Sequence, residues 1–380
     1  MQPFDFQPLT RFIFGIDSID RLGELALGLS AKRVLIVSDP GVVEAGHFET
    51  GAARLRAAGL EIASFHEFAE NPTTEMVDRG VATARGFQPD LLVGLGGGSS
   101  LDCCKGINFV YSCGGSMHDY HGVGKATGEM LPMIAVPTTA GTGSESQSFA
   151  LISDAKTHVK MACGDPRAAC KIALLDPRLT VTQPARVTML TGIDALSHAI
   201  ETYVTTRRNP MSLTFSRRAF GLLMTGFPRV LSDPSDLEAR GQMQFGACLA
   251  GLAIETSMLG AAHATANPLT ARFGISHGQA VGLMLPAVIR MNGEQHANWY
   301  EELLREVDPI ASFEDAPDRL AERIRGLLRQ AGLAISLAEL QVPEQDIPVL
   351  SQEALQQWTG HFNPIPLDQQ RAESLYRAVG

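Results

Sequence analysis

Short runs of apolar residues alternate with longer amphipathic stretches between residue 34 and about residue 180. Runs of this length that end in turn-forming residues are typical of strands. The runs that fit the pattern are 34–38, 90–95, 133–137 and 171–175. Amphipathic stretches between such runs indicate βαβ units, so we expect a mostly parallel sheet with helices on its faces. Ligands of such sheets bind at the loops that follow the strands.

The pattern changes after residue 177, where long segments with the apolar spacing of a helix take over. These segments include 195–204, 213–231 and 237–259. We therefore predict an α/β domain over residues 1–184 and an all-helical domain over residues 185–380. Segment 342–366 carries four prolines and is expected to be an irregular connection, followed by a last helix over residues 368–378.

Composition narrows the possible partners. Of the 380 residues, 45% are hydrophobic and 19% are charged, which is ordinary for a folded globular chain. The net charge is −10 and no cluster of basic residues follows a stripe, so we expect no nucleic acid partner. No apolar stretch has the length of a membrane span, and the first residues do not resemble a signal peptide, so we expect a cytoplasmic protein without a membrane partner. The six cysteines show no CxxC pairing and are expected to be reduced, packed thiols.

A run of glycines follows the second predicted strand. Residues 94–102 read GLGGGSSLD, and a stretch compatible with a helix, 103–109, comes next. The three consecutive glycines at 96–98 have no Cβ, so backbone amides can approach an anion such as a pyrophosphate at the start of that helix. The run departs from the usual dinucleotide fingerprint because position 99 is serine. Glycines that serve only a tight turn are the alternative.

A second loop, residues 137–145, also follows a predicted strand and is rich in small hydroxyl side chains. Thr138, Thr139, Thr142 and Ser144 could donate to phosphate or ribose oxygens, or could only cap local turns. Asp39 ends the first predicted strand, where a carboxylate accepts from a ribose 2′-hydroxyl and repels a 2′-phosphate. Its alternative is a turn before the following proline. Two such loops after strands of one sheet favour a nucleotide site, with NAD preferred over NADP.

Four residues of the helical half could hold a metal ion. Asp194 and His198 are four positions apart and would project from one face of a helix, although such a pair alone is more often a surface hydrogen bond. His263 and His277 stand in glycine- and alanine-rich surroundings, where a solitary histidine could equally be a satisfied core residue. Three imidazoles and one carboxylate together would bind a divalent first-row ion and leave a coordination position open. Fe(II) suits this set, and Zn(II) competes through its higher affinity.

Five motifs in the same order give the chain a resemblance to the iron-containing, or group III, alcohol dehydrogenases over nearly its whole length. The motifs are the glycine loop with Asp102 and Lys105, residues 137–145, residues 175–177, residues 192–201, and the stretch from His263 to Gly278. The resemblance implies a homodimer whose subunit has a Rossmann-like nucleotide-binding domain and a helical metal-binding domain, the dehydroquinate synthase-like fold. It also implies that the substrate binds in the cleft between the two domains.

The resemblance assigns roles to individual residues. The metal ligands are Asp194, His198, His263 and His277. The cofactor contacts are Asp39, Asn71, Gly97, Gly98, Ser99, Thr138, Thr139, Thr142, Phe149, Lys160 and Leu179. Among the cofactor contacts, Asn71 could instead form a turn, Lys160 could be a solvated charge, and Phe149 and Leu179 could belong to the core.

The expected function is a metal-dependent, NAD(P)-linked alcohol dehydrogenase or aldehyde reductase that acts on a small primary alcohol or aldehyde. The alternatives are a polyol or hydroxy-acid dehydrogenase of the same superfold, a lyase resembling dehydroquinate synthase, and a non-catalytic relative that binds nucleotide or metal. One departure matters, because many members of the family have a histidine four residues after the third ligand and this chain has Asn267. An amide does not exchange protons near neutral pH, so the proton route is expected to differ.

Overall fold

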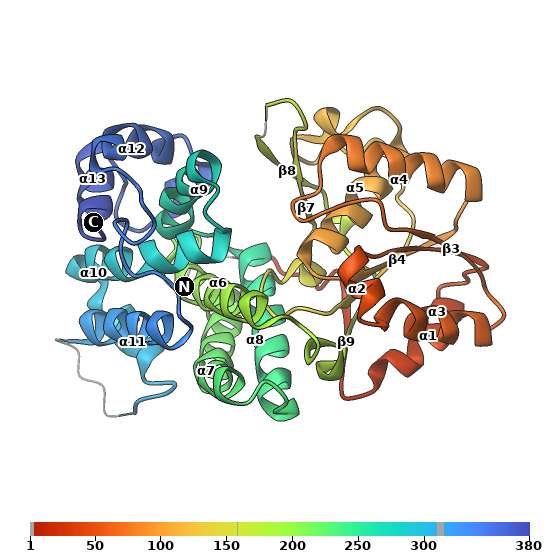
Figure 1. Ribbon diagram of the computed structural model, residues 1–380, viewed down its shortest axis with the longest axis horizontal. Coiled ribbons are helices and arrows are strands. Elements are labelled where there is room, and N and C mark those ends of the chain that lie inside the picture. The colour runs from red at the N-terminus through yellow and green to blue at the C-terminus, as the bar shows by residue number, and fades with distance from the viewer. Residues whose placement is uncertain (1–3, 158, 310–314) are drawn as a thin grey trace. The chain divides into compact units, whose positions relative to one another are not determined.

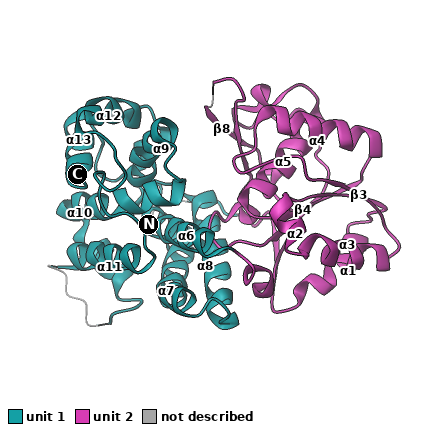
Figure 2. Ribbon diagram, in the orientation of Figure 1, with its two compact units in different colours: residues 1–6, 184–380 teal, residues 7–183 magenta. Residues whose placement is uncertain are grey.

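The computed structural model describes residues 4–157, 159–309 and 315–380 (Figure 1). The chain divides into two compact units, which are coloured separately in Figure 2. The first in sequence spans residues 7–183. The second spans residues 184–380 and includes residues 4–6.

The α/β unit is built on a sheet of six parallel strands in the order β1-β9-β6-β4-β2-β3. The strands are β1 (Arg11–Phe14), β2 (Arg33–Val37), β3 (Glu61–Phe65), β4 (Leu91–Gly96), β6 (Met133–Pro137) and β9 (Ile172–Leu175). The four predicted strands are confirmed as β2, β4, β6 and β9, which are the central strands of the sheet. The prediction missed β1 and β3, which are its two edges. Edge strands are partly exposed and do not need a continuous apolar run.

Helices cover both faces of this sheet. They are α1 (Leu22–Gly28), α2 (Pro40–Glu44), α3 (His47–Ala57), α4 (Thr74–Phe87) and α5 (Gly98–Cys113). Along β2, Leu35 and Val37 pack into a core with α4 and α5, whereas Val34 and Ile36 pack into a second core with α1 and α3. Burial on both faces explains why the central strands carry consecutive apolar residues rather than an apolar residue at every second position.

A smaller sheet of three strands, which the prediction missed, lies in the same unit. Its strands are β5 (Gly122–Val123), β7 (Phe149–Ser153) and β8 (Lys160–Gly164), and β7 and β8 form an antiparallel pair. Each of β7 and β8 has only five residues, and buried positions alternate with more exposed ones along β7.

The second unit is helical over its described residues, as predicted. Its helices are α6 (Ala185–Val204), α7 (Pro210–Ser232), α8 (Leu237–Thr256), α9 (Ala261–Phe273), α10 (His277–Leu304), α11 (Ala316–Gln330), α12 (Ile347–Leu355) and α13 (Gln369–Arg377). Segment 342–366 is less irregular than expected, because α12 lies within it. Pro348 stands in the first turn of α12, where a proline removes no helical hydrogen bond and its fixed φ suits the helix.

Helix α6 is the centre of the helical unit and packs against α7, α8 and α10. All of its residues from 192 to 204 are buried. Two glycines permit close contacts around it. A Cβ at Gly192 would lie 2.2 Å from the ring of Phe227, and a Cβ at Gly278, in the first turn of α10, would lie 2.2 Å from the carbonyl oxygen of Leu190. The start of α10 therefore rests directly on the backbone of α6.

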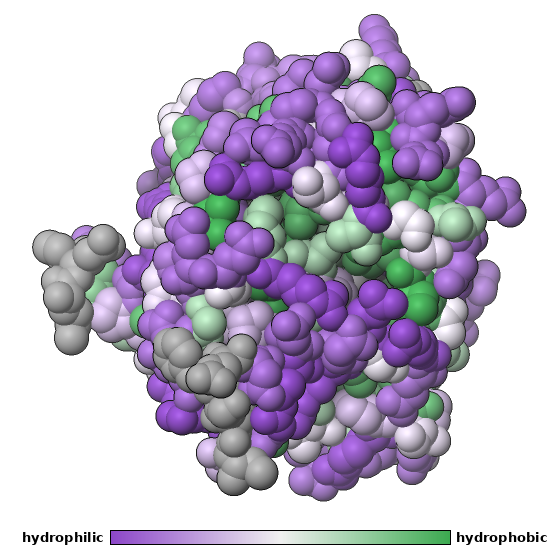
Figure 3. All heavy atoms as spheres, turned by 90° about the vertical axis from the view of Figure 1, so that its left-hand side faces the viewer, coloured by the Kyte–Doolittle hydropathy of each residue, from purple (hydrophilic) through white to green (hydrophobic). Residues whose placement is uncertain are grey.

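The face of the molecule seen in Figure 3 is mostly hydrophilic, with apolar side chains gathered in patches. Ion pairs one helical turn apart, such as Arg377 with Glu373 on α13, contribute to that hydrophilic surface. Within the described part of the chain, no single helix is long and apolar enough to cross a membrane. Helices α8 and α9 reach that length and composition only as a pair, which is bent by 104°.

The contact at Gly278 gives a testable prediction. Replacing Gly278 with Ala places a methyl group against backbone that cannot rotate away, and we expect the helical unit to lose about 1–3 kcal/mol of stability. Both tryptophans, Trp299 and Trp358, lie in this unit, so urea unfolding followed by tryptophan fluorescence reports on it alone.

Gly326, in α11, provides the matched control, because a Cβ there would meet nothing within 4 Å. Gly326→Ala should leave stability unchanged or raise it by up to about 1 kcal/mol. Equal unfolding midpoints for the two variants would show that the contact at Leu190 does not constrain the start of α10.

Candidate functional site

The proposed nucleotide loops meet at the carboxyl ends of the central strands. β3 lies on one side of β2 and β4 on the other, so the strand order reverses between β2 and β4, where open α/β sheets bind ligands. A Cβ at Gly97 would lie 3.1 Å from the side chain of Thr139, and one at Gly98 would lie 2.6 Å from that of Thr142. The glycines are therefore required for more than a turn, because the threonine loop packs directly on them.

The start of helix α5 has the features of an anion site. Its N-cap is Gly97, which has no side chain to cap the first amides of the helix. Those amides carry the positive end of the helix dipole. Three of the predicted contacts gather beside them. The amide of Asn71 donates to Ser99 Oγ at 3.2 Å, and Lys160 Nζ donates to Asn71 Oδ1 at 3.2 Å. The structure thus brings Asn71, Ser99 and Lys160 together from three separate segments.

Asp39 lies at the same crevice. Its Oδ1 accepts from the amide of Val42 at 3.1 Å, so it caps helix α2, and its Oδ2 accepts from Ser100 Oγ at 2.8 Å. A Cβ at Gly96 would lie 3.1 Å from that same Oδ2. Asp39 therefore both caps the turn that begins α2 and lies beside the glycine loop.

Of the remaining predicted cofactor contacts, some lie in the crevice and others lie in packed parts of the unit. The amide of Thr138 donates to the carbonyl oxygen of Gly96 at 3.0 Å, which keeps the two loops side by side. Phe149 begins β7, and its ring lies against Gly164 in the small sheet. Leu179 is 4% exposed and belongs to the apolar core beneath the sheet. The structure therefore places Thr138 in the crevice and Leu179 within the core.

Lys105 is a residue to which the sequence analysis gave no individual role. It is fully buried on α5, and its ammonium group donates to the carbonyl oxygens of Ser144, Gln147 and Phe149 at 2.6, 2.8 and 2.9 Å. Ser144 Oγ in turn donates to Asp102 Oδ1 at 2.7 Å. These bonds fasten the end of the threonine loop to the helix that begins at the glycine loop. A single lysine inside a helical stretch of apolar residues was the available indication of such a buried role.

The four predicted metal ligands come together in the helical unit. Asp194 and His198 lie one turn apart on α6, His263 lies on α9, and His277 is the first residue of α10. The Nε2 atoms of the three histidines lie 3.5, 3.7 and 3.7 Å from Asp194 Oδ1, in that order. One ligand atom each from Asp194, His263 and His277 can be chosen so that all lie within 4.8 Å of one another. Asp194, His198 and His263 are buried, whereas the side chain of His277 is 34% exposed.

The charges and unsatisfied atoms of this cluster suit a cation. Among the described residues, Asp194 Oδ1 and His263 Nε2 are buried and have no hydrogen-bond partner. Burial opposes ionisation of Asp194, but the neighbouring histidines, His198 first, lower the pKa of its carboxyl group far below the usual value. Burial likewise opposes the charge on His263, but Glu201 and Asp194 raise its pKa to about 9. The site therefore favours positive charge, and a divalent cation would satisfy the two buried atoms.

Glu201 joins this cluster, although the sequence analysis quoted it only as the end of a motif. Its Oε2 lies 2.5 Å from Nδ1 of His263, and the side chain is 2% exposed. Glu201 follows Asp194 by seven residues, so two helical turns place both on one face of α6. That spacing was the indication available in the sequence.

Asn267 lies one turn beyond His263 on α9. Its Nδ2 donates to Gln357 Oε1 at 2.9 Å, just before the 3₁₀ turn η7 (Trp358–Phe362). A Cβ at Gly360 in that turn would lie 3.2 Å from the Cβ of Ala264. Position 267 therefore carries an amide that joins α9 to the residue just before η7.

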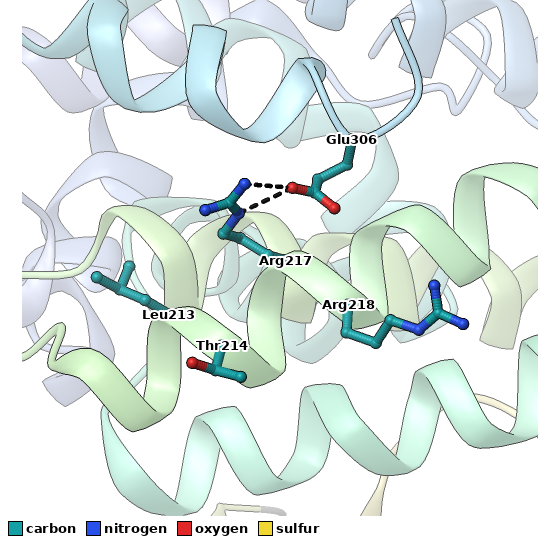
Figure 4. A pocket seen from close by; sticks show the side chains of 5 residues that line it. All are labelled: Leu213, Thr214, Arg217, Arg218 and Glu306. Atoms are coloured by element: carbon teal, nitrogen blue, oxygen red, sulfur yellow. Dashed lines mark hydrogen bonds and ion pairs between the residues drawn. The ribbon is translucent and has the colours of Figure 1, made fainter. Parts of the chain in front are cut away.

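A surface hollow of about 290 Å³ lies on α7 and involves none of these residues (Figure 4). Leu213, Thr214 and Arg218 line it together with Arg217, which forms an ion pair with Glu306 at 2.5 Å. Arg217 and Glu306 therefore already compensate each other's charge, and none of the proposed nucleotide- or metal-binding residues lines the hollow. The chemistry lies in the two clusters described above.

Comparison with known proteins extends these observations to the whole chain. The model of the iron-containing alcohol dehydrogenase family matches residues 9–177, and the model of that family's C-terminal region matches residues 188–380. An NAD-dependent methanol dehydrogenase of Bacillus methanolicus is 33% identical over 93% of this chain and 93% of its own. A 1,3-propanediol dehydrogenase of Klebsiella pneumoniae is 31% identical over 98% of each chain.

The fold agrees with these relationships. A crystal structure of a 1,3-propanediol oxidoreductase matches this chain with a TM-score of 0.96 and 31% identity over 100% of both chains. The predicted fold class and the resemblance read from the five motifs are confirmed, and with them the class of enzyme, a metal-dependent alcohol dehydrogenase. The chain belongs to the iron-containing alcohol dehydrogenase family.

Proposed function

We propose that this protein interconverts a small primary alcohol and its aldehyde with NAD(H), at a divalent metal held by Asp194, His198, His263 and His277. The observation that carries the proposal is the convergence of three imidazole nitrogens on one buried carboxylate oxygen, at 3.5–3.7 Å. Fe(II) is the proposed ion and Zn(II) its competitor. A divalent ion in such a set polarises the oxygen of the substrate, which favours hydride transfer to or from the nicotinamide.

The residues of the α/β unit have a complementary role in this proposal. The amides of Gly97, Gly98 and Ser99 would bind the pyrophosphate, since a helix N-terminus favours an anion. Asp39 would accept from the ribose hydroxyl. The other proposed contacts are Asn71, Thr138, Thr139, Thr142, Phe149, Lys160 and Leu179.

We further propose a cytoplasmic homodimer. The six cysteines are free thiols, which is typical of a reducing compartment. Phe14 and Ile16, at the edge strand β1, are 48% and 51% exposed, and apolar side chains at a sheet edge are a common site of association. Light scattering should give a mass about twice the 40.7 kDa of the chain. A monomer at micromolar concentration would exclude the dimer.

Removal of a metal ligand tests the central proposal. We expect His263→Ala and His277→Ala each to abolish NADH-dependent reduction of aldehydes and to weaken metal binding, because each removes one nitrogen donor from the set. A panel of aldehydes of graded size, assayed on protein reconstituted separately with Fe(II) and Zn(II), would identify the substrate class and the ion.

His296→Ala is the matched control, since His296 lies on α10 like His277 but stacks on Trp299 instead of facing Asp194. It should retain activity. Full turnover of the chelator-treated wild-type protein in metal-free buffer would contradict the proposal.

The coenzyme preference depends on Asp39 in this proposal. Asp39→Asn keeps the acceptor that caps α2 but removes the negative charge, so the ratio of kcat/KM for NADPH to that for NADH should rise at least about tenfold. Asp90→Asn is the control, because Asp90 precedes β4 and lies at the opposite end of the sheet. A ratio that is unchanged in Asp39→Asn would show that this carboxylate does not select the coenzyme.

The type of side chain at position 267 should affect the pH dependence of turnover. Asn267→His introduces a group that ionises near pH 6.5, one turn from His263, so kcat/KM plotted against pH should gain an inflection between about pH 6 and 7. Asn267→Gln preserves the amide and should not add that inflection. If the profiles of the two variants coincide, a group at this position takes no part in proton transfer.

A further inference from the structure

Glu201 holds two groups of helix α9 at once. Its Oε2 lies 2.5 Å from Nδ1 of His263, and its Oε1 accepts from the amide of Ala262 at 2.6 Å. Both bonds are buried, and they span 61 and 62 positions of the sequence. Each carboxylate oxygen of Glu201 therefore has its own partner on α9.

The start of α9 depends on side chains from outside the helix. Its N-cap, Gly260, provides no side-chain hydrogen bond. The first two amides are bound instead by Asn363 Oδ1, which accepts from Ala261 at 3.3 Å, and by Glu201 Oε1. A Cβ at Gly260 would lie 3.0 Å from both of these oxygens, so a glycine is needed where they approach. Glu201 therefore places a carboxylate oxygen at the positive end of the helix dipole, where the amide of Ala262 donates to it.

The bond between Glu201 Oε2 and Nδ1 determines which nitrogen of His263 carries a proton. A carboxylate with no proton can only accept, so Nδ1 must be the donor. In the neutral ring, Nε2 then carries the lone pair. Nε2 is also the atom that lies 3.7 Å from Asp194 Oδ1 and has no hydrogen-bond partner among the described residues. The donor atom of His263 is thus aimed at the cluster by a bond on the opposite side of its ring.

We propose that Glu201 is a positioning residue of the metal centre, which sets the tautomer and the orientation of His263 so that Nε2 is presented to the ion. The inference rests on the proposed metal site. The competing explanation is that Glu201 only caps α9. In that case its removal would lower stability and leave metal affinity unchanged.

Glu201→Gln tests the proposal, because it preserves shape while replacing one acceptor oxygen with a donor NH₂ that cannot pair with a second N–H. We expect the dissociation constants for Zn(II) and Co(II), measured by competition with a chelator, to rise about 10–100-fold. The visible absorption bands of bound Co(II) should also shift. Both readouts are independent of turnover. Urea unfolding of the metal-free protein measures the capping contribution separately.

Glu301→Gln is the matched control, since Glu301 is a glutamate of the same unit whose side chain is 10% exposed and whose partner is Arg305. Its metal affinity should stay within about twofold of the wild-type value. If Glu201→Gln does not fold, Glu201→Asp serves in its place, because it keeps the charge but is one methylene too short to hold both partners. It should also bind metal more weakly than Glu301→Gln.

The outcomes separate this inference from the proposed function. Failure of the wild-type protein to bind Zn(II) or Co(II) overturns the metal site and the role of Glu201 with it. Tight binding by both the wild-type protein and the Glu201 variants overturns the role of Glu201 alone, whether or not the metal-free protein is less stable. Equal weakening in Glu301→Gln overturns it too, because the loss would then be general. Selective weakening in the Glu201 variants supports it.

Discussion

A buried carboxylate surrounded by imidazoles is the constraint on which the helical unit depends. Placing the charge of Asp194 out of water is costly unless that charge is compensated, and three histidine nitrogens within 3.7 Å are its compensation. The histidines come from three helices, so α6, α9 and α10 must approach one another closely. Gly278 permits that approach where α10 begins, since any Cβ there would overlap the backbone of α6. Packing and charge thus impose the same arrangement.

In the α/β unit, a buried lysine, Lys105, holds the loops of the nucleotide crevice in place. This crevice is formed by main-chain amides and small hydroxyl side chains, which have little packing of their own to hold them in place. Lys105 provides the hold by donating to three carbonyl oxygens of the following loop. Three charge-assisted hydrogen bonds to neutral acceptors offset the free-energy cost of burying one ammonium group. The glycines then allow Thr139 and Thr142 to approach the start of α5, as they could not if these positions carried side chains.

The sequence predicted those features that depend on local pattern. The central strands carry consecutive apolar residues because both of their faces are covered, and the sequence pattern predicted them. The edge strands β1 and β3 were not predicted, because a half-exposed strand of four or five residues has no distinctive period. Helix α12 was missed because prolines were taken to exclude a helix, although Pro348 occupies a first turn. The bond between Glu201 and His263 joins residues 62 positions apart, and no local pattern reveals such a pair.

Local sequence pattern likewise predicts the class of reaction of this protein but not the route of the proton. The residues proposed to hold the metal and the pyrophosphate lie in motifs whose types and spacing are imposed by the ligand itself. The groups that would move a proton are not constrained in this way, because water, a hydroxyl or an imidazole can each serve. Asn267 shows this freedom. Its amide is bonded to Gln357 and packs η7 against α9, which is a structural use of a position that could have carried a proton donor. Membership of the family therefore fixes the class of reaction more firmly than it fixes the path of the proton.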